Sequence, residues 1–287
     1  MKWLIPAKTF LLGEYAALAG ASAIVLTTTP YFKLKLSEDA GLEGIHPESP
    51  AGLFWTQQKH TQGLIWHDPY QGCGGLGASS AQFLASYLAS CSLQNILPKL
   101  NATLRSYYQY AWPGQGIRPS GYDVIAQARQ GCVFINKELN IIQSYPWPFK
   151  DLSFLLIHTG VKLATHDHLQ TTPLPAGIEE LAATVEQARI AFENRDSALL
   201  IQAINTYHEQ LKQRQCVAKH SLEFLDYLKT YPEILASKGC GAMGADILLV
   251  LCAKKDVLSL KNQLMRNNCS ILGTEEDLTP VNAPFFV

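Results

Sequence analysis

Glycine recurs at a fixed spacing in two places, and this constrains the backbone more than any other feature of the chain. Residues 72–81 read GCGGLGASSA, with Gly72, Gly74 and Gly77 in a G-x-G-x-x-G pattern, and residues 239–244 repeat the spacing. Glycine adopts backbone conformations that other residues avoid and lets a ligand approach the main chain closely. Both segments are therefore predicted to be tight loops beside a ligand.

The surroundings of both loops argue against a dinucleotide-binding turn. Such a turn follows a buried strand, opens a helix and has an acidic residue about 20 positions later. The first loop follows WHDPYQ, which is no buried strand, and no Asp or Glu occurs from Pro69 to Tyr122. The second loop precedes a strand, DILLVLC, where a helix would be needed.

The window without carboxylates suits a polyanionic ligand instead. A helix is predicted directly after the first loop, and free N–H groups at a helix N-terminus bind phosphate. The first acidic residue after the window is Asp123, a candidate base for a hydroxyl nucleophile. Taken alone, the window also fits an apolar helical hairpin in which Asp123 only caps a helix, so this alternative stays open.

Composition excludes several classes of protein. The 287 residues are 47% hydrophobic and 16% charged, with a net charge of −1, which predicts a folded globular protein and no nucleic-acid partner. Pro6 interrupts the apolar N-terminus and no apolar run is long enough to span a bilayer, so neither a signal peptide nor a membrane span is expected. Seven irregularly spaced cysteines favour a reducing cytoplasm over a disulfide framework.

Hydrophobic periodicity predicts two α+β halves, residues 1–150 and 151–287. Residues 37–72 lack a clear period and are expected to form loops and a short edge strand. Strands are expected at 9–13, 22–26, 31–36, 132–136, 153–158 and 246–252, and helices at 81–91, 97–108, 123–129, 181–192, 197–213, 217–230 and 254–267.

Five segments resemble, in order, the motifs of the GHMP kinases, the superfamily of galactokinase, homoserine kinase, mevalonate kinase and phosphomevalonate kinase. The segments are PAKTFLLGEYAALAG (6–20), GGLGASSA (74–81), SGYDVIAQ (120–127), HTGVKLAT (158–165) and KGCGAMGAD (238–246). The resemblance implies an α+β, two-domain GHMP kinase fold. Its ATP-binding N-terminal domain would resemble domain 2 of ribosomal protein S5, and its C-terminal domain would be ferredoxin-like.

The resemblance also implies roles for individual residues. Asp123 would be the catalytic base, with Lys8 beside it and the transferred phosphoryl group. ATP would lie along the second motif, and the Ser79 hydroxyl would contact Mg²⁺. The ATP-binding residues would be Gly74, Gly75, Leu76, Gly77, Ala78, Ser79 and Ser80. The small-molecule acceptor would contact Glu14, Tyr15, Ser120, Gly121, Thr165, Gly241 and Ala242.

Some of these assignments have simpler alternatives. Ser79 and Ser80 could only cap the helix, and Tyr15 could be a packing residue. Met243 and Ala245 stand where the family usually has glycine, so the third motif is expected to have less backbone freedom. The alternating His166-Asp167-His168 invites a metal site, but no further ligands suggest themselves and a solvated loop is favoured.

The phosphoryl acceptor is left open between two pathway intermediates. GEY at 13–15 and Asp246 resemble phosphomevalonate kinases, with Arg118 and Lys162 as candidate contacts for a second phosphate. HTGVKLAT resembles mevalonate kinase equally well, although no acidic residue precedes Asp123 at the position of that enzyme's metal-binding Glu. Phosphomevalonate is favoured, with mevalonate and a non-catalytic ligand-binding protein as alternatives; a homodimer is also left open.

Overall fold

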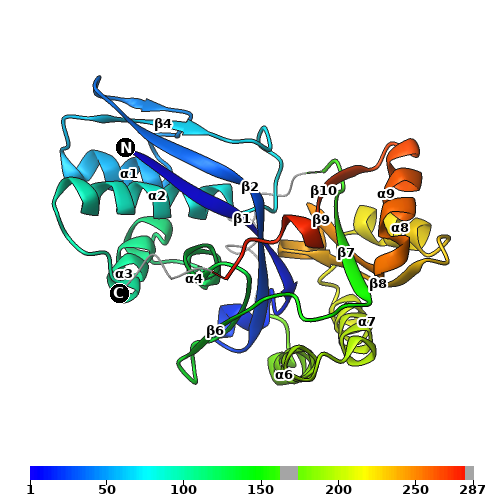
Figure 1. Cartoon of the computed structure of the whole chain (residues 1–287). Coiled ribbons are helices and arrows are strands. Elements are labelled where there is room, and N and C mark those ends of the chain that lie inside the picture. Colours follow the sequence, from blue (N-terminus) through cyan, green and yellow to red (C-terminus); the bar gives the residue numbers. More distant parts are fainter. Residues whose placement is uncertain (162–173, 282–287) are drawn as a thin grey trace.

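The computed structural model describes residues 1–161 and 174–281, the side chain of Ala242 excepted. Within them, two sheets lie side by side, each covered by helices (Figure 1). The mixed α+β class expected from the sequence is confirmed.

In these residues, the first sheet has six strands in the order β3-β4-β2-β5-β6, with β1 paired to β2. Its strands are β1 (Lys2–Leu12), β2 (Ala23–Ser37), β3 (Leu42–Glu43), β4 (Gly63–His67), β5 (Cys132–Asn136) and β6 (Ile141–Tyr145). All pairs are antiparallel except β3 with β4. The prediction of separate strands at 22–26 and 31–36 is wrong, because the β-branched threonines between them continue β2, where Thr27 and Thr28 pair with β1.

Four helices accompany this sheet: α1 (Pro50–Gln58), α2 (Ala78–Leu93), α3 (Leu100–Ala111) and α4 (Tyr122–Arg129). Over 37–72, loops and a short edge strand were expected; β3 lies at the sheet edge as expected, whereas α1 and the further strand β4 were not expected. Helix α1 has a clear start, since the Ser49 side chain accepts a hydrogen bond from the Gly52 N–H and Pro50 stands at the first helical position. The buried residues of α1, among them Phe54 and Trp55, share one face, but the apolar Leu53 is exposed, so the sequence pattern does not mark that face.

In the described residues, the second sheet has four strands in the order β10-β7-β9-β8, all antiparallel. The elements are β7 (Leu152–His158), α6 (Ile178–Asn194), α7 (Ser197–Gln213), α8 (Lys219–Leu228), β8 (Ile234–Cys240), β9 (Ile247–Ala253), α9 (Val257–Arg266) and β10 (Ser270–Thr274). Counted along the chain, the strand order is 4-1-3-2, which is the ferredoxin-like arrangement that was predicted. Strands β6, β8 and β10 were not predicted from the sequence.

Both faces of the second sheet are buried, and one face joins the core of the first half. On β7, Leu155 and Ile157 pack toward α8 and α9, whereas Phe154 and Leu156 belong to the large core that also contains the interior of the first sheet. Burial on both faces explains why β7 and β9 read as continuous apolar runs. The two sheets divide near residue 150 while sharing this core, and the division into domains 1–150 and 151–287 stays a prediction.

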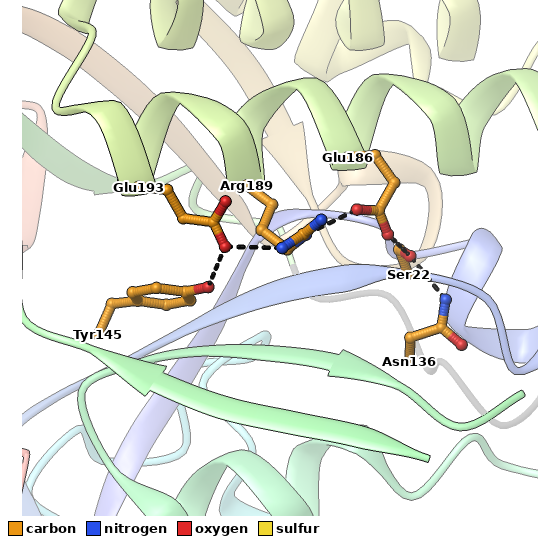
Figure 2. A network of polar contacts seen from close by, with 6 residues as sticks. All are labelled: Ser22, Asn136, Tyr145, Glu186, Arg189 and Glu193. Atoms are coloured by element: carbon orange, nitrogen blue, oxygen red, sulfur yellow. Dashed lines mark hydrogen bonds and ion pairs between the residues drawn. The ribbon is translucent and has the colours of Figure 1, made fainter. Parts of the chain in front are cut away.

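A polar network fastens α6 to the first sheet (Figure 2). The Glu186 carboxylate accepts a hydrogen bond from Ser22 at 2.5 Å and one from Arg189 at 2.7 Å. Arg189 also donates to Glu193 at 2.6 Å, and that carboxylate accepts from the Tyr145 hydroxyl. These contacts join α6 of the second half to β6 and to the residue before β2 in the first half.

None of the helices within residues 1–161 and 174–281 combines the length and the apolar character needed to cross a membrane.

Candidate active site

A cavity of about 840 Å³ lies where β1, the first glycine loop, the start of α4 and the second glycine loop meet. This volume lies within the range of small-molecule sites in proteins. Its lining includes ionisable groups, among them Lys8, Glu14 and Asp123. It also includes apolar and aromatic side chains, among them Pro50, Leu53, Tyr107, Tyr110 and Trp112.

Lys8 and Asp123 form an ion pair in the lining of the cavity. The Lys8 Nζ atom lies 3.2 Å from Asp123 Oδ2, and the Asp123 side chain is 31% exposed whereas that of Lys8 is 9% exposed. Lys8 comes from the buried strand β1, and Asp123 from the first turn of α4. Two residues 115 positions apart therefore form one ion pair that faces a ligand-sized space.

The end of the first glycine loop is hydrogen-bonded to β1. The Lys8 backbone N–H donates to the Leu76 carbonyl at 3.0 Å, and Gly77 begins α2 with a φ of 76°. A Cβ atom at Gly77 would lie 2.7 Å from Lys8 Cγ, closer than atoms can approach. Glycine is thus needed here both for its left-handed backbone and for the space that Lys8 occupies.

The predicted phosphate-binding residues line the cavity together, from Gly74 to Ser80. The N-terminus of α2 carries free N–H groups and a positive end of the helix dipole, which is an anion-binding arrangement. Ser79 is exposed at this N-terminus, whereas the buried Ser80 hydroxyl donates to the Gly77 carbonyl at 2.9 Å. Ser79 is therefore the hydroxyl of the two that is turned to the ligand space.

The two glycine loops touch each other. A Cβ atom at Gly74 would lie 2.7 Å from Asp246 Oδ1, and one at Gly75 would lie 2.9 Å from the Asp246 Cβ. Asp246 is 4% exposed and also lines the cavity. The sequence window around the first loop lacks carboxylates, but the fold brings this one in from the second half.

The second glycine loop lies between β8 and β9 and includes one turn of 3-10 helix, Ala242–Gly244. Met243 adopts a left-handed backbone with a φ of 56° although it is not glycine, a conformation that costs about 1–2 kcal/mol. Its N–H donates to the Tyr15 hydroxyl at 3.1 Å, and its carbonyl accepts from the Ala218 N–H at 2.7 Å. These two hydrogen bonds hold the Met243 backbone in a conformation that glycine would adopt more easily. Ala245 does not have a positive φ, so glycine is not needed at that position.

Glu14 and Tyr15 follow β1 and line the cavity. The Glu14 carboxylate is paired with the fully buried Lys238 of β8. Burial raises the pKa of the Glu14 carboxyl above its usual range, although Lys238 opposes the shift. Burial also raises the pKa of Tyr15, which keeps its hydroxyl neutral.

The structure places only some of the other residues predicted to contact the acceptor in the lining of the cavity. Ser120, Gly121 and Gly241 line the cavity, and the Ala242 side chain lies outside the described residues, as do Thr165, Lys162 and the 166–168 His-Asp-His segment. Arg118 stacks on the Tyr108 ring at 4.6 Å and is absent from the described lining of the cavity. The roles assigned to all these residues stay predictions.

The apolar and aromatic lining residues Pro50, Leu53, Tyr107, Tyr110 and Trp112 were not predicted from the sequence as site residues. They come from α1 and from the end of α3 with the loop that follows, where no motif of the chain lies. An unusual density of aromatic residues at 107–112, YYQYAW, was the one signal available.

Known proteins resemble this chain at the level of the fold. Neither a protein-family model nor a curated protein sequence matches the chain. Solved structures do match. Streptococcus pneumoniae phosphomevalonate kinase in complex with phosphomevalonate and AMPPNP superposes with a TM-score of 0.78 at 15% identity, over 96% of this chain and 99% of that one.

Two further kinases match over similar lengths. Methanococcus jannaschii mevalonate kinase gives a TM-score of 0.72 at 15% identity over 98% of both chains. Lactococcus lactis galactokinase complexed with galactose gives 0.70 at 13% identity, over 94% of this chain and 92% of that one. The chain has the GHMP kinase fold. In this fold, the cavity described above lies between the two glycine loops that the sequence motifs identify.

Proposed function

We propose that this chain is an ATP-dependent kinase that phosphorylates a small acceptor of the mevalonate pathway. The observation that carries the proposal is the Lys8–Asp123 pair, 3.2 Å apart, in the same cavity as an anion-binding helix N-terminus. Phosphoryl transfer needs a positioned nucleophile and compensation of phosphate charge more than covalent help from the protein. The pair supplies a carboxylate and a cation at one point.

The reaction would proceed by direct transfer. The acceptor hydroxyl oxygen forms a bond to the γ-phosphorus of ATP, the bond from that phosphorus to the bridging oxygen breaks, and ADP leaves. Asp123 would accept the hydroxyl proton. Lys8 would offset the negative charge on the transferred group.

The N–H groups at the start of α2 and the Ser79 hydroxyl suit ATP and Mg²⁺. The first glycine loop and the N-terminus of α2 line the cavity together, and a helix N-terminus can bind phosphate through its free N–H groups. Mg²⁺ prefers oxygen ligands and usually keeps waters and substrate phosphates in its shell, so one exposed hydroxyl, Ser79, suits it. When bound, Mg²⁺ would neutralise charge on the phosphate oxygens. Within the described residues, no cluster of three His, Cys, Asp or Glu could hold a metal without the nucleotide.

The acceptor we favour is 5-phosphomevalonate. Support comes from the TM-score of 0.78 to a phosphomevalonate kinase, against 0.72 for the mevalonate kinase, and from Asp246 at the end of the third motif. One observation favours mevalonate as the second candidate. Among the described residues that line the cavity, Lys8 is the one cation, beside the carboxylates of Glu14, Glu48, Asp123 and Asp246. A second phosphate would be repelled there unless Lys162 reaches it.

The proposal is tested by ADP release from Mg-ATP with four acceptors in parallel: 5-phosphomevalonate, mevalonate, galactose and homoserine. Turnover with 5-phosphomevalonate alone supports the favoured acceptor, and turnover with mevalonate alone supports the second candidate. Turnover with galactose or homoserine would move the protein to another branch of the same fold. ATP binding without turnover on any acceptor would contradict the proposal and favour a ligand-binding role.

A further inference from the structure

The side chains of Tyr108 and Lys137 form a clamp on the backbone that leads into α4, the helix that carries Asp123. The Tyr108 hydroxyl donates to the Ser120 carbonyl at 2.8 Å. The Lys137 ammonium donates to the same carbonyl at 3.1 Å and to the Tyr108 hydroxyl at 2.9 Å. The Arg118 guanidinium lies over the Tyr108 ring, 4.6 Å from its centroid.

The direction of these hydrogen bonds is fixed by Lys137. An ammonium group can only donate, so the Tyr108 oxygen must accept from Lys137 and direct its own hydrogen to the Ser120 carbonyl. That carbonyl then receives two hydrogen bonds, one of them from a charged donor, and hydrogen bonds of this kind are the stronger ones. The arrangement has one favourable orientation for each group.

The clamp also touches the next residue, Gly121. This residue begins α4 with a φ of 74°, and a Cβ placed on it would lie 2.5 Å from the Tyr108 hydroxyl. Glycine is therefore required because Tyr108 lies directly against the main chain. The following residue, Tyr122, is buried, and its hydroxyl donates to the Gly20 carbonyl at 2.7 Å and accepts from the Lys137 backbone N–H at 3.1 Å.

Asp123 is the next residue along, in the first turn of α4, with its carboxylate on Lys8. The residues at 120–122 are thus held by hydrogen bonds from Tyr108, Lys137 and Tyr122 immediately before the carboxylate that would accept the proton. A shift of the main chain at 120–122 would move the Asp123 carboxylate with it. Displacement of a catalytic group by about 1 Å can lower the rate by a factor of about 100.

We infer that Tyr108 and Lys137 are positioning residues that hold Asp123 at the distance needed for proton transfer. The inference rests on the proposed function, in which Asp123 is the base. Neither residue belongs to a motif of the sequence, since they come from α3 and from the turn between β5 and β6.

The test compares Tyr108→Phe, Lys137→Met and Lys137→Arg with the wild type, using Mg-ATP and the acceptor that the wild type turns over. Tyr108→Phe and Lys137→Met are expected to lower kcat about 10- to 100-fold, with the KM for ATP and the Tm little changed. Lys137→Arg, which keeps a charged donor, is expected to recover most of the kcat. Tyr227→Phe and Lys229→Met are matched controls on and next to α8, and they should leave kcat unchanged.

An active wild type whose Tyr108→Phe and Lys137→Met variants keep full kcat would overturn the inference. So would a fall in Tm that accounts for the lost activity, because the role would then be structural. An inactive wild type would count against the proposed function instead. The clamp is then judged by amide hydrogen exchange at Tyr122 and Asp123, which should be at least about tenfold faster in Tyr108→Phe; an unchanged rate overturns it.

Discussion

Glu14 and Lys238 form a buried ion pair that joins the end of β1 to β8. The Glu14 Oε1 atom lies 2.6 Å from Lys238 Nζ, and the two side chains are 3% and 0% exposed. The second carboxylate oxygen, Oε2, is buried and has no hydrogen-bond partner among the described residues. Because Glu14 lines the cavity, the same carboxylate that links the two halves of the chain also faces the ligand space.

Breaking this pair on one side is expected to cost more stability than removing it. Lys238→Met leaves a buried carboxylate and Glu14→Gln leaves a buried ammonium, and each should lower the free energy of unfolding by about 3–5 kcal/mol. The double variant should lose clearly less than the sum, because it leaves no unpaired charge. Urea unfolding of the four proteins measures this coupling. The exposed pair Lys229–Asp226 is the control, and strictly additive losses at Glu14 and Lys238 would contradict the prediction.

The pH dependence of stability gives a second measurement of the same carboxylate. Burial raises the pKa of Glu14 above its usual 4.5, and Lys238 is the largest opposing influence, so Lys238→Met should raise it further. Below pH 4.5 the carboxyl is protonated in both states. Above it the unfolded chain ionises first, so the contribution of Glu14 to stability is lost as the pH rises through the raised pKa.

We therefore expect Lys238→Met to lose stability relative to the Lys238→Met, Glu14→Gln double variant as the pH is raised from 4.5 to neutrality. Chemical denaturation at a series of pH values gives the difference directly. A difference that stays constant with pH would mean that Glu14 titrates normally without Lys238.

Local patterns predicted part of this site. The glycine spacing, the window without carboxylates and the position of Asp123 are features of short segments, and the structure has Asp123 3.2 Å from Lys8. A glycine loop followed by a helix start is encoded by adjacent residues, so such a feature can be read without knowing the fold.

The contacts between distant segments could not be predicted in the same way. Glu14 and Lys238 are 224 positions apart, and Asp246 reaches Gly74 from the second half of the chain. The motifs mark Glu14, Lys238 and Asp246 as members of motif segments, but they do not reveal which of them meet, because those contacts depend on how the two sheets pack. The positions of Tyr108 and Lys137 around Ser120 depend on tertiary contacts for the same reason.

Asp123→Asn should separate chemistry from binding. The amide keeps the shape of the side chain but cannot accept the hydroxyl proton, so kcat is expected to fall at least about 100-fold. ATP affinity, measured by calorimetry, should change little because the glycine loop is untouched. Asp226→Asn on α8 is the control. Wild-type turnover in Asp123→Asn would remove this residue from the mechanism.

Ser79→Ala should raise the Mg²⁺ concentration needed for half-maximal activity. Ser79 is exposed at the start of α2, and loss of a direct ligand should cost at least about tenfold in metal affinity, the scale seen even for outer-shell partners. Ser92→Ala, near the end of the same helix, controls for the loss of a serine. An unchanged Mg²⁺ titration would reduce Ser79 to a residue that only begins the helix.

Gly77→Ala tests whether the first glycine loop and Lys8 depend on the same space. A Cβ at Gly77 would lie 2.7 Å from Lys8 Cγ and 2.8 Å from Lys8 Cε, so Lys8 must move away from Asp123. We expect turnover to fall at least about 100-fold, because the displaced ammonium no longer meets the transferred phosphoryl group.

Gly114→Ala is a matched control, since Gly114 has a φ of 87° and nothing within 4 Å of the added Cβ. Both variants place an alanine in a left-handed backbone conformation, which should lower the free energy of unfolding by about 1–2 kcal/mol. Only Gly77→Ala also brings a Cβ atom into collision with Lys8. Thermal unfolding and steady-state kinetics on both variants separate the two effects. Equal kcat values for Gly77→Ala and Gly114→Ala would mean that the position of Lys8 is not set by this loop.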